Sequence, residues 1–124
     1  MHHTREIPRE RWADYLLLLS AVERDQQVRI QAAGPELGDQ RVAWNLPLVE
    51  ILVEEKGSDE GAIEVTVGNP GEELTHRIRH PVHVWAEESD TGELECLDIE
   101  DEDHVKTLIS FESRELLEEL PAPA

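Results

Sequence analysis

Histidine and arginine are concentrated in one stretch of an otherwise acidic chain, LTHRIRHPVHVW at residues 74–85, which contains three of the six histidines and no carboxylate. Imidazoles bind transition metals and titrate near neutral pH, and guanidinium groups bind carboxylates or phosphates through two parallel hydrogen bonds. A site for a small ligand or an anion is therefore expected here. The candidate ligand-binding residues are His76, Arg77, Arg79, His80 and His83.

A metal site in this stretch would use His80 and His83, which flank Pro81. A strand rises about 3.3 Å per residue, so His76 and His80 on one straight strand would lie about 13 Å apart. Zinc binds imidazole nitrogens at about 2.0–2.1 Å, and that separation is too large for one ion. A bend at Pro81 would let His80 and His83 converge, and these two residues are the predicted metal ligands.

The same residues also have a purely structural interpretation. On a strand, His76 and His80 would share a half-buried face with Ile78. The two arginines between them would point the other way and pair with acids of neighbouring strands, such as Glu64 or Glu95. A third possibility is a pH switch, because surrounding carboxylates favour the charged form of histidine.

Length and composition limit the class of protein. The 124 residues predict a single domain over 1–124, and the one cysteine, Cys96, excludes an internal disulfide. The longest apolar run has five residues, Tyr15–Leu19, and we expect neither a membrane-spanning helix nor a signal peptide. The net charge of −18 excludes nucleic acid and anionic membranes as partners. We expect a cytoplasmic protein without a cofactor.

The low lysine count, two against nine arginines, combined with this acidity suggests adaptation to a salty cytoplasm. A codon bias in a mesophilic source is the alternative.

Hydrophobic periodicity predicts an α+β fold. Apolar residues at three- and four-residue spacing predict a helix over 5–24, with Pro8 in its first turn and with Leu17 and Leu18 widening its apolar face. Alternating residues then predict a bent antiparallel meander of six strands, or a small barrel, over 27–112. A short helix over 113–120 and a tail over 121–124 follow, and the first helix packs on the sheet.

Four local features accompany this pattern. The fourth strand is expected to run from Leu74 past Pro81 to Ala86. Asn69-Pro70-Gly71 predicts a type II turn, and a change of parity predicts a bulge near Cys96. The three tryptophans lie on apolar periodicities and are predicted to be core residues, namely Trp12, Trp44 and Trp85.

Four motifs, EIPRERW at 6–12, NLPLVEI at 45–51, VG at 67–68 and LTHRIRHPVHV at 74–84, resemble an uncharacterised bacterial family classified only as a domain of unknown function. The resemblance extends in order over nearly the whole chain. It implies a small single-domain bacterial protein, and it supplies no activity, cofactor or catalytic residue.

Catalytic signatures are lacking in the sequence. There is no G-x-S-x-G, P-loop, G-x-G-x-x-G, H-E-x-x-H or C-x-x-C motif, and acids are too abundant for any pair to be specific. We therefore expect no enzyme, and interpret the chain as an accessory or protein-interaction domain whose wide apolar helix face would support a homodimer. The alternative is a ligand-, anion- or divalent-metal-binding domain that uses residues 74–85.

Overall fold

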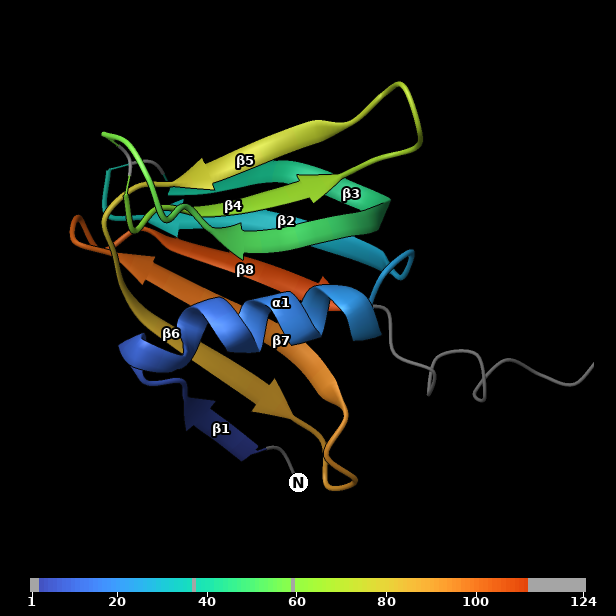
Figure 1. Ribbon diagram of the computed structural model, residues 1–124, viewed down its shortest axis with the longest axis horizontal. Helices are drawn as coiled ribbons and strands as arrows, with labels where there is room; N and C mark the ends of the chain where they lie inside the picture. The colour runs from blue at the N-terminus through green and yellow to red at the C-terminus, as the bar shows by residue number, and fades with distance from the viewer. Residues whose placement is uncertain (1–2, 37, 59, 112–124) are drawn as a thin grey trace, which may run out of the picture.

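Eight strands and one α-helix make up residues 3–36, 38–58 and 60–111, which are the residues that the computed structural model describes (Figure 1). The N-terminal part contains one strand, a 3-10 turn and the helix, namely β1 (His3–Glu6), η1 (Arg9–Arg11) and α1 (Trp12–Val22). The remaining strands are β2 (Gln27–Gly34), β3 (Gly38–Val53), β4 (Ile63–Val67), β5 (Leu74–Ile78), β6 (Pro81–Glu88), β7 (Leu94–Asp101) and β8 (Lys106–Phe111).

The strands form one open antiparallel sheet in the order β1-β6-β7-β8-β2-β3-β4-β5. Two meanders, β2–β5 and β6–β8, are joined where β8 pairs with β2, and β1 adds an edge beside β6. The prediction of a six-stranded meander or barrel is therefore wrong. The predicted short helix over 113–120 lies outside the described residues.

The strand prediction failed at Pro81, because the expected strand over residues 74–86 is two strands. β5 and β6 lie near opposite edges of the sheet, although only Arg79 and His80 separate them. Proline cannot donate a ladder hydrogen bond, and His80 has a positive φ of 53°, so the chain turns away from β5 here. Figure 1 shows this connection passing along one side of the strongly bent sheet.

The N-terminal helix is shorter than predicted. His3–Glu6 pairs with β6, and the Ile7 N–H donates to the Val84 carbonyl at 2.8 Å, which continues this contact. Pro8 is extended, with ψ at 146°, and the α-helix begins only at Trp12. The predicted start at residue 5 is wrong because pairing with β6 overrides the local helical pattern. No helix within the described ranges has the length and apolarity to span a membrane.

The long strand β3 changes partners at Pro47. Its first part pairs with β2 and its second part, from Leu48 onward, pairs with β4. The β2 side of this second part is covered by other segments: the backbone of Leu48 bonds Asp25 and Gln26, and the Ser20 hydroxyl of α1 bonds the backbone of Ile51. The helix is therefore attached to an otherwise unpaired strand edge by polar contacts as well as by packing.

Two local predictions are confirmed and one is wrong in part. The Glu72 N–H donates to the Asn69 carbonyl at 2.9 Å around Gly71, whose φ is 84°, as a type II turn requires. The ladder between β6 and β7 shifts beside Cys96, which is the predicted bulge. Trp12 is buried in the core, but Trp85 is only half-buried and Trp44 is 37% exposed.

Candidate functional site

The sequence-predicted binding residues on β5 point to two faces of the sheet. His76 pairs with Val65 and is half-buried on the core side with Ile78; burial lowers the pKa of its imidazole. Arg77 points the other way, and its guanidinium lies 3.5 Å from the Glu64 carboxylate. The predicted cross-strand pair of Arg77 with Glu64 is therefore confirmed.

The remaining candidates lie on other segments. Arg79 and His80 form the exposed link between β5 and β6, where the His80 carbonyl accepts a hydrogen bond from the Glu102 N–H. His83 lies on β6, where its ring stacks on Trp85 at 4.8 Å. The five predicted ligand-binding residues are thus spread over two strands and a link, and none of them lines either of the two cavities beside α1.

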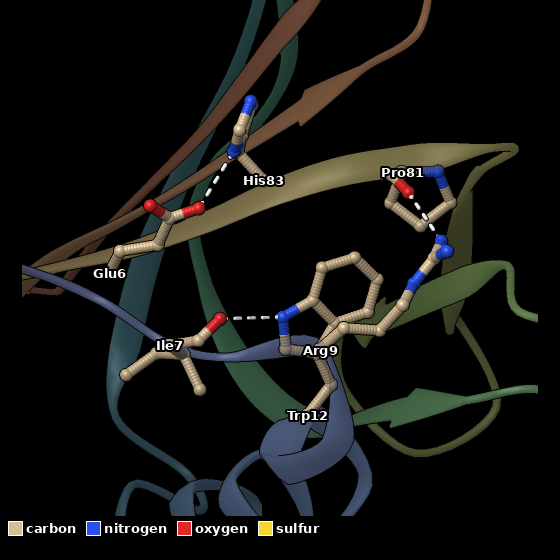
Figure 2. A network of polar contacts seen from close by, with 6 residues as sticks. All are labelled: Glu6, Ile7, Arg9, Trp12, Pro81 and His83. Atoms are coloured by element: carbon tan, nitrogen blue, oxygen red, sulfur yellow. Dashed lines mark hydrogen bonds and ion pairs between the residues drawn. The ribbon is translucent and has the colours of Figure 1, made fainter.

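His83 belongs to a polar network that attaches the N-terminal segment to β6 (Figure 2). Its Nδ1 lies 2.7 Å from the Glu6 carboxylate, and the Arg9 guanidinium donates to the Pro81 carbonyl at 3.0 Å. Trp12 donates its indole N–H to the Ile7 carbonyl at 2.8 Å. The first two contacts join the N-terminal segment to β6, and the third fixes the start of α1 against the residue that follows β1, so the network has a structural explanation.

A metal site would require further ligands around the predicted pair His80 and His83. Across residues 3–36, 38–58 and 60–111, no group of three His, Cys, Asp or Glu side chains is close enough to hold a metal ion. The nearest carboxylate contact of His83 is the single one from Glu6. The described residues therefore supply no complete coordination sphere for these two histidines.

Cys96 has the wrong surroundings for a nucleophile. Burial, followed by the negative charge of Glu87, raises the pKa of its thiol to about 11. A catalytic thiol needs the opposite shift, which positive groups or a helix N-terminus provide. Cys96 is accordingly a partly buried residue beside the bulge in β7.

The feature best suited to bind a partner is a cavity of about 420 Å³ between α1, the β6–β7 hairpin and the end of β8. Its apolar lining comes from segments far apart in the sequence, namely Tyr15, Leu18, Leu19, Val22, Leu94 and Phe111. Its polar lining consists of Arg5, Glu23, Gln26, Glu88 and Glu93. An apolar concavity with a few polar groups at its edge is the usual form of a binding site.

Charge at the rim of this cavity is organised around Arg5. Its Nε lies 3.1 Å from the Glu88 carboxylate, and its guanidinium lies 5.7 Å from the centre of the Tyr15 ring. Burial raises the pKa of the Tyr15 hydroxyl, which stays protonated and available as a hydrogen-bond donor at neutral pH. With Glu23 and Glu93 also present, the rim is negative overall.

The cavity continues into an exposed apolar surface on α1. Leu17, Leu18 and Val22 are 68%, 65% and 65% exposed, although each is a large aliphatic side chain. Periodicity drew attention to the wide apolar face of this helix, but not to the cavity. The hairpin and β8 residues that complete it are brought there by strand order, for which the sequence carried no local signal.

Comparison with known proteins gives a family and no activity. No curated protein and no solved structure matches the chain. A family model described as a family of unknown function, DUF5335, matches residues 3–120. This match covers nearly the whole sequence and confirms the resemblance noted from its motifs. The chain belongs to the DUF5335 family.

Proposed function

We propose that this protein is a non-catalytic interaction domain that binds an apolar segment of a protein partner in the cavity beside α1. The observation that supports the proposal is the continuity of a cavity of about 420 Å³ with exposed Leu18 and Val22 of α1. Exposed apolar surface next to a concavity is typical of sites that bind proteins.

A protein segment fits this surface better than a small molecule. The cavity volume falls within the range of about 300–1,000 Å³ that small-molecule sites occupy. A ligand confined to it would nevertheless leave Leu17 uncovered, since Leu17 is 68% exposed and does not line the cavity. An amphipathic segment of a partner would cover the cavity and the adjoining helix face together.

Charge indicates the chemistry of this partner. Glu23, Glu88 and Glu93 surround the cavity against one cation, Arg5, in a chain of net charge −18. A segment with apolar residues on one side and lysines or arginines on its flanks would be attracted, whereas nucleic acid and anionic lipid would be repelled. We infer a cytoplasmic protein partner of this kind.

The test uses a synthetic peptide with leucines on one helical face and lysines on the other, followed by fluorescence anisotropy at 0.15 M salt. Leu18→Glu combined with Val22→Glu should weaken binding by about tenfold or more, because apolar anchors dominate such interfaces. Val82→Glu combined with Leu74→Glu is the matched control, since both are exposed aliphatic residues, at 46% and 42%, that lie outside the cavity. Equal weakening by both variants would mean that binding does not depend on the cavity and its apolar helix face, and would refute the proposal.

Self-association distinguishes a second copy from a different partner. If the partner is a different protein, as proposed, sedimentation equilibrium should show this protein as a monomer over a wide concentration range. A concentration-dependent dimer that Leu18→Glu disrupts and Val82→Glu does not would make a second copy of the chain the occupant of this surface.

A further inference from the structure

Two arginines flank one exposed tryptophan on the face of the sheet opposite the core. In β2, Val28, Ile30 and Ala32 are buried and Arg29 and Gln31 are exposed, so the latter two define the outer face. Trp44 pairs with Arg29 and Arg41 pairs with Gln31, which places both β3 residues on the same face.

The guanidinium carbons of both arginines lie close to the indole of Trp44. The distance to the ring centre is 4.4 Å for Arg41 and 5.2 Å for Arg29. Both contacts fall within the range of about 6 Å in which an aromatic ring attracts a cation. One exposed ring therefore contacts two groups of like charge.

These two arginines differ from the other cations that contact aromatic rings. Arg5 over Tyr15 pairs with Glu88, Lys106 over Trp85 pairs with Asp98, and Arg9 over Trp12 donates to the Pro81 carbonyl.

In the part of the chain that the structure describes, Arg29 and Arg41 make no ion pair and no side-chain hydrogen bond. This is notable in a chain with 29 acids. Both are exposed residues.

The charge and hydrogen-bonding groups of this arrangement favour an anionic ligand. Two guanidinium groups held by one ring repel each other, and an anion bound to either of them lowers that repulsion. Each guanidinium offers paired N–H donors that match a carboxylate or a phosphate. The contact with the indole already restricts the arginine side chain, so binding an anion costs less side-chain entropy.

We propose that Arg29, Trp44 and Arg41 form a binding site for a small oxyanion, a carboxylate or phosphate group carried by a small molecule. A small ligand is favoured over a polyanion because only two cations are available, and the net charge of −18 would repel an extended acidic chain. The site lies on the outer face and shares no residue with the cavity beside α1. It can therefore be tested independently of the proposed function.

The test follows the indole N–H signals of the three tryptophans by NMR in ¹⁵N-labelled protein. Trp44→Phe identifies the Trp44 signal by its loss. Inorganic phosphate, succinate and citrate are added at constant ionic strength, with sodium chloride as the reference salt. We expect a saturable shift of the Trp44 signal with at least one of these anions, without a shift of the Trp12 signal.

Substitutions identify the groups responsible. Arg29→Gln combined with Arg41→Gln should weaken binding by about tenfold or more, because charge-assisted hydrogen bonds are lost. Arg5→Gln is the control, because Arg5 also contacts an aromatic ring but is already paired, and it should leave affinity unchanged. The spectrum of each variant reports whether it is folded.

Two results would overturn the site. One is a Trp44 shift that sodium chloride reproduces at equal ionic strength. The other is saturable binding that persists in the double arginine variant. The profile over the anions separates the sources: preference for phosphate indicates a phosphate ester, and preference for succinate or citrate indicates a carboxylic acid.

Discussion

Replacing Ser20 by alanine tests how α1 is attached to the sheet. The Ser20 hydroxyl is buried, accepts the Ile51 N–H at 2.7 Å, and lies 2.8 Å from the Ile51 carbonyl and 2.7 Å from the Leu16 carbonyl. Ile51 itself is fully buried, in the part of β3 that β2 does not cover. Alanine would leave its N–H without a partner.

The expected loss of stability follows from two opposing effects. A buried donor left without a partner costs about 1–3 kcal/mol. Alanine is the better helix former, by about 0.5 kcal/mol relative to serine, which offsets part of that cost. The net loss should be about 1–2 kcal/mol. A chain of this size loses about 4 °C of melting temperature per kcal/mol, so Tm should fall by about 4–8 °C.

Urea unfolding followed by circular dichroism, with calorimetry for Tm, measures this change. Ser58→Ala is the matched control, because Ser58 is exposed in the loop between β3 and β4, and it should alter the free energy of unfolding by less than about 0.5 kcal/mol. If Ser20→Ala unfolds at the same urea concentration as the wild type, the hydroxyl does not satisfy Ile51, and the account of the β3 edge is wrong.

Two further predictions concern the turn before β5 and the titration of His76. Gly68→Ala should destabilise the protein more than Gly71→Ala. Both glycines have positive φ, but only at Gly68 would the new Cβ lie 2.7 Å from the Glu72 carbonyl oxygen. Equal losses of stability in thermal unfolding would contradict this prediction. Burial lowers the folded-state pKa of His76 below its ordinary value of 6.5, so the unfolded chain takes up this proton first as pH falls, and stability is lost below about pH 6.5. His76→Gln should remove that part of the pH dependence, measured by urea unfolding between pH 5.5 and 8; parallel curves for variant and wild type would refute it.

The sequence predicted those parts of the fold that depend on residues close together in the chain. The turn at Asn69–Gly71 and the bulge beside Cys96 rest on residues adjacent in the chain, and both are present. The strand β1 and the separation of β5 from β6 rest on pairing between distant segments, and both were missed. A proline in a run of alternating residues is compatible with a bend or with a new strand, and only the position of the partner strand decides.

The same reasoning explains why the candidate sites were not predicted. Residues 74–85 attracted attention because their histidines and arginines are close in sequence. Side chains alternate between the two faces of β5, and the link at Arg79 and His80 leads to a distant strand, so these residues do not meet in the structure. In contrast, Arg41 and Trp44 are three residues apart and would lie on opposite faces of a regular strand. The register shift beside Arg29 adds Asn45 to β3, and the shift beside Gln31 adds Val42. These extra residues place the side chains of Trp44 and Arg41 on the outer face. The shifts also explain why Trp44, predicted to be buried, is exposed and available to hold two arginines.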